Sequence, residues 1–384
     1  MRYADRSMQV SSITAHVLRA PLEEPFAFSQ FSYTHREAML VEVRTDDGLV
    51  GWGEAYGPAR LTGTIVHEFL GPLLLGQDPR DVEANWELLY ARSVDYGQKG
   101  VMLAAISALD IACWDIKSRA VGQPLYRMLG GSHADSIQCY ATGFYFPQSE
   151  PVERRFEREA RRFVADGFRA MKIKVGLGVE RDVELVQRVR GVVGPAVKLM
   201  IDANHAYTPT EAIALGRKLE DADLWWFEEP VSCIDVDAYL EVKSRINIPL
   251  AGGECESTRF GFKPWLQRRA FDYCQPDICA CGGVSEGMKI AALASLTGIH
   301  VTPHAWGSAI GQAAALHFYA ARPRQPFTLT PDRKLIECDC SENPLRTSIV
   351  REPIAFVDGD WKLPTTAGLG VEVLPEALEQ YRAG

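Results

Sequence analysis

Three segments near the middle of the chain decide the fold: Ala170-Met171-Lys172-Ile173-Lys174, Lys198-Leu199-Met200-Ile201-Asp202 and Leu224-Trp225-Trp226-Phe227-Glu228. Each is a short apolar run that closes on an ionisable residue. Four more runs of this kind surround them, over residues 138–142, 249–254, 271–275 and 300–303. Amphipathic segments with helical periodicity separate the runs, and this alternation predicts an α/β fold with a parallel sheet.

The spacing of the runs favours a closed barrel. The residues at or just past their ends are Lys174, Asp202, Glu228, Glu254, Asp277 and His304, which follow one another at intervals of 23 to 28 residues. That period is typical of βα units in a parallel barrel, where catalytic groups lie at the carboxyl ends of the strands. All six residues are ionisable, so we expect a site at that end of the barrel.

The first third of the chain reads as a separate α+β unit. An apolar run over residues 38–43, a turn at Asp46-Asp47-Gly48 and a second run over residues 49–54 predict a β-hairpin. Helical segments follow over about residues 63–92 and 100–120. The last forty residues lack another βα unit, and we expect them to return to the N-terminal unit. The predicted domains are a capping domain at 1–125, a barrel at 126–344 and a returning segment at 345–384.

Length and composition exclude several classes of protein. The 384 residues suffice for two or three domains, and 47% hydrophobic with 24% charged residues is an ordinary globular composition. A net charge of −9 disfavours nucleic acid as a partner. Nine cysteines without a CxxC pair predict free thiols, and the longest apolar stretch, residues 101–114, is interrupted and too short to cross a bilayer. We therefore expect a cytoplasmic protein with no membrane partner.

Three carboxylates on consecutive strand ends predict a metal site. Asp202, Glu228 and Glu254 would repel one another if they lay close together without a cation. Three hard oxygen ligands favour Mg²⁺, and Mn²⁺ also fits them. The alternative is that each carboxylate caps a helix or pairs with an arginine.

Lys172 and Lys174 are candidates for proton transfer. Alternation along a strand sends both side chains to the same side. Inside the barrel and near a divalent cation, a lysine would have a lowered pKa and could accept a proton. The alternative is a pair of surface lysines, which the apolar neighbours and the small number of lysines, eleven in the chain, disfavour.

Asp277 and His304 follow the next two runs and predict a second acid/base. A carboxylate on a neighbouring strand fixes the imidazole tautomer and raises its basicity. A cation site between two such groups suits removal of the proton next to a substrate carboxylate, followed by its return or by loss of a β-oxygen.

The ordered motifs resemble the enolase superfamily, specifically its mandelate racemase and muconate lactonizing enzyme branch, over nearly the whole chain. They are Gly51-Trp52-Gly53-Glu54, Lys172-Ile173-Lys174, Asp202-Ala203-Asn204, Glu228-Glu229-Pro230, Gly252-Gly253-Glu254, Gln275-Pro276-Asp277, Pro303-His304 and Gly368-Leu369-Gly370. The resemblance implies a modified TIM barrel, (β/α)7β, under an N-terminal α+β capping domain, and a homo-oligomer.

The resemblance also implies roles for particular residues. Asp202, Glu228 and Glu254 would bind Mg²⁺, Lys174 would be a base, and Lys172 would neutralise the substrate carboxylate. His304 with Asp277 would be the opposite acid/base. Further contacts to the substrate are implied for Glu337, Asn204 and His205.

Longer strings, including Tyr140-Ala141-Thr142-Gly143 and Asn343-Pro344-Leu345-Arg346, are similar to the sugar-lactone cycloisomerases, those of galactarolactone and 3,6-anhydrogalactonate. These enzymes open an acid-sugar ring by β-elimination to a 2-keto-3-deoxy acid. An acid-sugar dehydratase, a racemase and a binder of acid sugars without turnover remain alternatives. Cys255-Glu256 departs from the pattern, and the extra carboxylate of Glu256 could alter substrate choice.

Loops of the capping domain should determine specificity, because barrel loops alone would leave the metal exposed. We expect lid loops at about 24–33 and 54–61. Phe28, Tyr56 and Arg60 are the predicted substrate contacts in them, with Arg60 pairing with a distal carboxylate or hydroxyl of the acid sugar. Ordinary packing is the alternative for the two aromatic residues.

Overall fold

The structure is a computed structural model that describes residues 8–323 and 335–383. Residues 1–7 of the expected capping domain, residues 324–334 of the expected barrel and residue 384 of the expected returning segment lie outside the described residues. None of the helices in the described ranges is long and apolar enough to cross a membrane.

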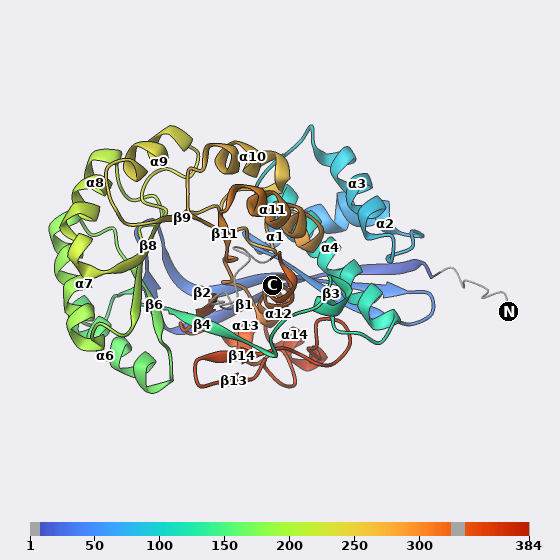
Figure 1. The fold of residues 1–384 in the computed structure, drawn as a ribbon. Coiled ribbons are helices and arrows are strands. Elements are labelled where there is room, and N and C mark those ends of the chain that lie inside the picture. The colour runs from blue at the N-terminus through green and yellow to red at the C-terminus, as the bar shows by residue number, and fades with distance from the viewer. Residues whose placement is uncertain (1–7, 324–334, 384) are drawn as a thin grey trace.

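Eight parallel strands form the barrel in the order β11-β10-β9-β8-β7-β6-β4-β12. Their bounds are β4 Ser136–Thr142, β6 Ala170–Lys174, β7 Lys198–Asp202, β8 Leu224–Glu228, β9 Leu250–Gly252, β10 Tyr273–Cys274, β11 His300–Val301 and β12 Leu335–Asp339. Within the described residues, seven α-helices lie between them: α6 Val152–Ala165, α7 Val179–Val193, α8 Pro209–Lys218, α9 Val236–Lys243, α10 Thr258–Arg268, α11 Gly283–Thr297 and α12 Ala309–Ala321. Helices α6 to α10 form an outer ring (Figure 1). The predicted (β/α)7β barrel is confirmed.

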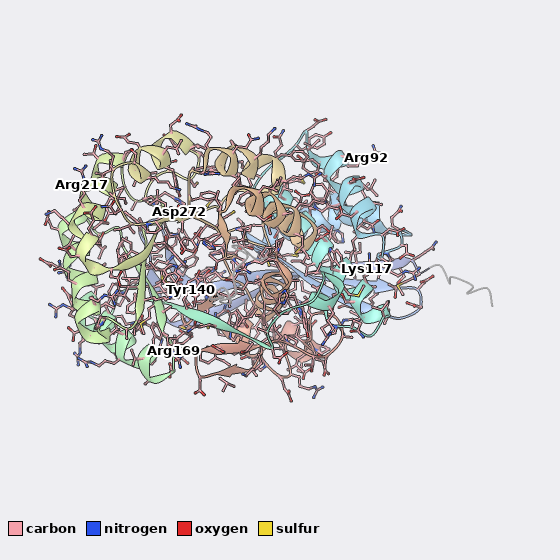
Figure 2. All side chains as sticks on the ribbon, in the orientation of Figure 1. Arg92, Lys117, Tyr140, Arg169, Arg217 and Asp272 are labelled. Atoms are coloured by element: carbon pink, nitrogen blue, oxygen red, sulfur yellow. The ribbon has the colours of Figure 1, made fainter. Side chains whose placement is uncertain are left out.

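The barrel interior is packed, because side chains alternate between its two faces along each strand. In β6, Met171 and Ile173 belong to the apolar core beneath the helices, whereas Ala170 belongs to a separate inner cluster. The inner cluster consists of Tyr140, Ala170, Met200, Trp226, Ala251 and Leu335, and Tyr140 is labelled in Figure 2. Lys172 and Lys174 follow Ala170 at the same phase, so both point inward above this layer.

Three strands end earlier than the sequence predicts, for backbone reasons. Gly253 has a φ of +117°, which takes the chain out of β9. Pro276 and Pro303 lack an amide hydrogen and cannot continue a hydrogen-bonded ladder after β10 and β11. As a result, Glu254, Asp277 and His304 stand on the loops just beyond their strands.

The N-terminal sheet is antiparallel, in the order β3-β2-β1-β5. Its strands are β1 Val10–Ala27, β2 Ser32–Thr45, β3 Val50–Ala55 and β5 Phe146–Pro147, and its helices are α1 Ala59–Ile65, α2 Gly71–Leu74, α3 Val82–Ser93, α4 Val101–Ala120 and α5 Leu125–Met128, with a π-helical turn at Val66–Leu70. Strand β5 comes from the chain that follows β4, so the sheet spans the hairpin and the barrel.

The expected lid loops are shorter than predicted. Strand β1 continues through Ala27 and β2 begins at Ser32, so residues 24–27 and 32–33 lie in strands and only residues 28–31 form the hairpin loop. Within residues 54–61, β3 ends at Ala55 and α1 begins at Ala59. The long β1 was missed because its sequence contains Pro21 and Pro25 and alternates only in part.

The C-terminal segment contacts both the barrel and the N-terminal unit. It contains α13 Pro344–Thr347, β13 Phe356–Val357, β14 Asp360–Lys362 and α14 Pro375–Gln380. Strand β14 pairs with β4, and isolated bridges join Leu18 to Arg382 and Pro124 to Gly368.

Buried carboxylates of the N-terminal unit cap two barrel helices. Asp110 of α4 accepts the Ser285 amide at 3.0 Å and the Ser285 hydroxyl at 2.6 Å at the start of α11. Glu54 of β3 accepts the amides of Ser308 at 2.8 Å and Gly311 at 2.6 Å at the start of α12. Free amides at a helix N-terminus favour such anions, so these contacts hold the two units in one arrangement.

Gly283→Ala tests this arrangement. Gly283 has a φ of +86°, and a methyl group there would collide with the Asp110 carboxylate. We expect a loss of about 1–3 kcal/mol in the free energy of unfolding, measured by urea denaturation. Gly191→Ala in α7 is the matched control, because nothing lies within 4 Å of its added methyl. The control variant should be as stable as the wild type or slightly more stable. Equal stabilities of the two variants would contradict the contact between Asp110 and the start of α11.

Candidate active site

The carboxyl ends of the barrel strands bring the ionisable residues into one buried basin. Lys174 lies opposite Asp202 in the β6–β7 register, and Asp202 lies opposite Glu228 in the β7–β8 register. Lys172, Lys174, Asp202 and Glu228 are all buried, and Glu254 follows on the next loop. The register of the parallel strands therefore places these side chains beside one another.

Asp202, Glu228 and Glu254 form the expected cluster of three carboxylates. One oxygen of each lies within 4.8 Å of the others. Oε2 of Glu254 is buried and has no hydrogen-bond partner among the described residues. Such an orphaned carboxylate oxygen, in a set made only of hard oxygen donors, fits a divalent cation such as Mg²⁺.

The two lysines neutralise only part of this charge. Lys172 forms an ion pair with Glu228 and lies 2.9 Å from Glu337 Oε1, and Lys174 Nζ lies 2.6 Å from Asp202 Oδ2. With Glu254, four carboxylates share two ammonium groups. The His304 imidazole is a third cationic neighbour and is matched by Asp277. With every carboxylate ionised, two negative charges are left over, which one divalent cation would balance.

The pKa shifts reflect the same excess of negative charge. Burial raises the pKa of Glu228 to about 8 against the attraction of Lys172, and Asp202 and Glu254 add to the rise. Burial lowers the pKa of Lys174, but the carboxylates of Asp202, Glu254 and Glu228 together outweigh burial and raise it above the ordinary value. The lowered pKa expected for this lysine presupposed a divalent cation beside it; among these carboxylates its pKa is raised instead, although Lys172 lowers it.

Lys174 is held at a defined position. Its Nζ also donates to Asn204 Oδ1 at 2.9 Å and lies 5.7 Å from the ring centre of Phe28. Asn204 and His205 both have positive φ angles, 44° and 62°. Strain in the backbone of non-glycine residues is common at functional sites.

His304 and Asp277 form the predicted pair on the other flank of the three carboxylates. His304 Nδ1 lies 2.6 Å from Asp277 Oδ2, and Asp277 Oδ1 accepts the Cys279 amide at 2.6 Å. Burial lowers the pKa of His304, but Glu254 and the hydrogen bond to Asp277 raise it to about 10. Next to this pair, Glu337 accepts the Thr142 hydroxyl at 2.6 Å and the Ala305 amide at 2.8 Å.

A cavity of about 380 Å³ opens over this basin, a size common for small-molecule sites. It is lined by Phe28, Gln30, Tyr33, Tyr56, Tyr145, Lys174, Asn204, His205, Glu254, Cys255, His304, Trp306 and Glu337. The structure thus brings Phe28 and Tyr56 from the capping domain, and Asn204 and His205 from the barrel, to the same space.

The structure does not bring Arg60 or Glu256 to the cavity. Ala59 and Thr62 fill the buried face of α1, so Arg60 is exposed on the other face. Glu256 Oε2 lies 2.5 Å from Lys99 Nζ and 3.3 Å from Trp265 Nε1, outside the site. Arg60 is therefore not part of the cavity lining, and its pairing with a substrate stays a prediction; Glu256 links the barrel to the capping domain.

Three aromatic residues that line the cavity were not predicted from the sequence: Tyr33, Tyr145 and Trp306. Trp306 stands two residues beyond His304 on the same loop, a position that could have indicated it. The Arg36 guanidinium lies 3.6 Å from the centre of the Trp306 ring and forms a buried ion pair with Asp339. Arg36 of strand β2 thus packs against the Trp306 ring and helps to hold it in the cavity wall.

The fold and the site define an α/β-barrel enzyme with an N-terminal capping domain. The family model described as "Enolase C-terminal domain-like" matches residues 155–377, and that described as "Mandelate racemase / muconate lactonizing enzyme, N-terminal domain" matches residues 12–130. The chain belongs to the enolase superfamily, in its mandelate racemase and muconate lactonizing enzyme branch.

Similar proteins include enzymes of sugar-acid metabolism. The chain is 42% identical to D-galactarolactone cycloisomerase of Agrobacterium fabrum over 98% of this chain and 99% of the relative. It is 34% identical to arabinonate dehydratase of Saccharolobus solfataricus over 90% of this chain and 91% of the relative.

Solved structures that are similar to this chain include a cycloisomerase and a racemase. The crystal structure of 3,6-anhydro-D-galactonate cycloisomerase from Zobellia galactanivorans has a TM-score of 0.89 and 39% identity, covering 98% of this chain and 100% of the other. A racemase from Streptomyces coelicolor A3(2) with bound magnesium has a TM-score of 0.88 and 28% identity, covering 97% of this chain and 100% of the other.

Asp277→Asn tests the His304–Asp277 pair. An amide hydrogen facing Nδ1 would make that nitrogen an acceptor, so we expect the pKa of His304 to fall from about 10 toward the ordinary value. The raised pKa stabilises the folded protein; this contribution is complete below about pH 6.5 and is lost as the pH rises through 10. The Asp277→Asn variant should therefore lose less stability than the wild type between these pH values. NMR titration of the imidazoles measures the shift. His317, whose pKa burial lowers to about 4, is the internal control. An unchanged His304 titration would exclude the pairing.

Proposed function

We propose that this chain is a sugar-lactone cycloisomerase, which opens the ring of an acid-sugar lactone or anhydro acid sugar to a 2-keto-3-deoxy acid. The observation that carries the proposal is one buried cavity in which Lys174 and the His304–Asp277 pair flank three carboxylates. The similarity to two cycloisomerases over nearly the full chain supports the same reaction class.

Asp202, Glu228 and Glu254 are the proposed ligands of Mg²⁺, and Mn²⁺ also fits this set. The magnesium in the similar racemase supports Mg²⁺. When bound, the cation stabilises the negative charge that develops on the substrate carboxylate as the α-proton leaves.

The protein's own groups handle the protons. One of Lys174 and His304 removes the α-proton, and the electron pair of that C–H bond moves toward the carboxylate. The bond from the β-carbon to the ring oxygen then breaks, and the opposite group protonates that oxygen. The enol that results tautomerises to the keto acid. Lys172 and Glu337 are proposed to hold the substrate carboxylate, Asp277 to orient His304, and Asn204 and His205 to contact the substrate near the cation.

The walls of the cavity suit a compact ring. Phe28, Tyr56 and three further aromatic residues present flat apolar faces, against which the C–H faces of a sugar ring pack well. Among the described residues that line the cavity, the basic residues Lys174, His205 and His304 all lie on the barrel side. A small acid sugar or its lactone is the proposed substrate class.

An acid-sugar dehydratase is the second candidate, because a dehydratase is also among the similar proteins. It would use the same proton abstraction and lose a β-hydroxyl as water. The racemase and the binder without turnover stay as alternatives that the experiment below distinguishes. The cytoplasmic location, the homo-oligomer and the lack of nucleic-acid or membrane partners stay predictions.

Incubation in deuterated water with galactarolactone, 3,6-anhydrogalactonate and open-chain acid sugars tests the reaction, with NMR as the readout. We expect a ring-opened keto acid from a cyclic substrate. Loss of water from an open-chain acid would support the dehydratase, and exchange without conversion the racemase. No exchange with any substrate would leave only the binder.

Lys174→Ala and His304→Ala assign the two groups. The variant that lacks the base should lose α-proton exchange by about 10²- to 10⁴-fold, whereas the variant that lacks the acid should retain exchange and lose ring opening. Lys218→Ala and His67→Ala, both on the surface, are the matched controls. If both site variants exchange the α-proton at the wild-type rate, the mechanism is wrong.

A further inference from the structure

A second cluster of metal-binding side chains lies beside the three carboxylates. His205, Cys233 and Cys255 stand on the loops that follow β7, β8 and β9, and each offers one ligand atom within 4.8 Å of the other two. Nε2 of His205 lies 4.0 Å from Sγ of Cys255. Cys255 is exposed, Cys233 is half-buried, and both are free thiols. His205 and Cys255 line the cavity, so the cluster lies at its mouth.

Glu229 prepares His205 for this role. Nδ1 of His205 lies 3.2 Å from Oε2 of Glu229, and the His205 amide donates to the Glu229 carbonyl at 2.9 Å. A small rotation of the ring turns the side-chain contact into a hydrogen bond and leaves Nε2 free to bind a metal. Metal-binding histidines usually donate their other ring nitrogen to a carboxylate in this way.

Glu229 also supplies an independent reason to expect a cation here. Its side chain is fully buried, and neither carboxylate oxygen has a hydrogen bond within the described part of the chain. Glu229, Glu254 and Cys255 each have a ligand atom within 4.8 Å of the others, so a second carboxylate lies close by. Buried carboxylates without hydrogen-bond donors are costly, and a metal on Nε2 of His205 would make its Nδ1–H a stronger donor to Glu229.

We propose that His205, Cys233 and Cys255 form a Zn²⁺ site at the mouth of the cavity, separate from the three carboxylates, and that Zn²⁺ bound there inhibits the enzyme. Two thiolates and one imidazole are ligands that Zn²⁺ prefers, whereas Mg²⁺ prefers oxygen. Binding of Zn²⁺ releases one proton from each thiol, which leaves a neutral centre with a fourth position for water.

Inhibition follows from the position of the ligands. Zn²⁺ would fix His205 and Cys255, two residues of the cavity wall, and would occupy space beside Glu254, which lines the same cavity. A substrate could then no longer use His205. The proposal does not depend on which acid sugar is the substrate, since it concerns only the residues at the mouth.

Co²⁺ tests the site spectroscopically in the full-length, reduced, Mg²⁺-saturated protein. Co²⁺ bound to thiolates gives an intense near-ultraviolet charge-transfer band, whereas Co²⁺ bound to carboxylates gives none. We expect the band in the wild type and in Asp202→Asn, which alters the three-carboxylate site and keeps all three proposed Zn²⁺ ligands. Cys233→Ser should abolish or strongly weaken it. Cys340→Ser, a half-buried cysteine elsewhere in the barrel, is the control and should retain it. Absence of the band in the wild type, or its persistence in Cys233→Ser, would overturn the proposal.

Zn²⁺ titration of turnover tests the inhibition. Cys233 does not line the cavity, so Cys233→Ser should have wild-type activity without Zn²⁺. Its inhibition by Zn²⁺ should be weaker by more than about tenfold. Equal inhibition of the wild type and Cys233→Ser would mean that Zn²⁺ acts elsewhere, for example by displacing Mg²⁺ from the three carboxylates.

Discussion

An excess of buried negative charge at the carboxyl end of the barrel is the constraint on which the rest of the structure depends. Strand register brings Asp202, Glu228, Glu254 and Glu337 together, and only two ammonium groups face them. Such a cluster is stable only with a further cation, and it becomes useful only if water is largely excluded. Asp202, Glu228 and Glu254 of the barrel are the proposed ligands of that cation. The capping domain covers the cluster and so limits its access to water.

The covering is built into the fold at several points. Carboxylates of the capping domain occupy the N-termini of α11 and α12, the two barrel helices next to the His304 loop. Strand β5, which follows β4, pairs with the end of β1, so the hairpin that carries Phe28 is attached to the barrel. The aromatic residues of the cavity wall and the proposed proton-transfer groups, Lys174 and His304, are thereby held in a single arrangement.

Much of the barrel and of the site was predictable from the sequence. Both depend on the spacing of residues along the chain and on which face of a strand a residue occupies. The spacing of Lys174, Asp202 and Glu228 gave the barrel and the cluster, and the two-residue period gave the inward direction of Lys172. The failures concern features that spacing does not encode. Arg60 is exposed because the apolar face of α1 determines its direction, and a one-residue change of phase on a helix turns a side chain by about 100°.

Other features depend on contacts between distant segments, which no local pattern reports. Glu256 pairs with Lys99 from the capping domain, and the Tyr145 and Trp306 walls come from different loops. Strand β1 has few local signals, since its pairing with β2 rather than its own alternation determines it. The meeting of Cys233 with Cys255 and His205 likewise requires three loops to converge.

The most direct test of the central claim is a crystal structure of the protein with Mg²⁺ and an acid sugar that reacts slowly, for example in the Lys174→Ala variant. The account predicts that the sugar's carboxylate lies toward Asp202, Glu228 and Glu254. Its α-carbon should lie between the position of residue 174 and His304. A sugar bound outside this cavity, or with its α-carbon remote from both positions, would contradict the account.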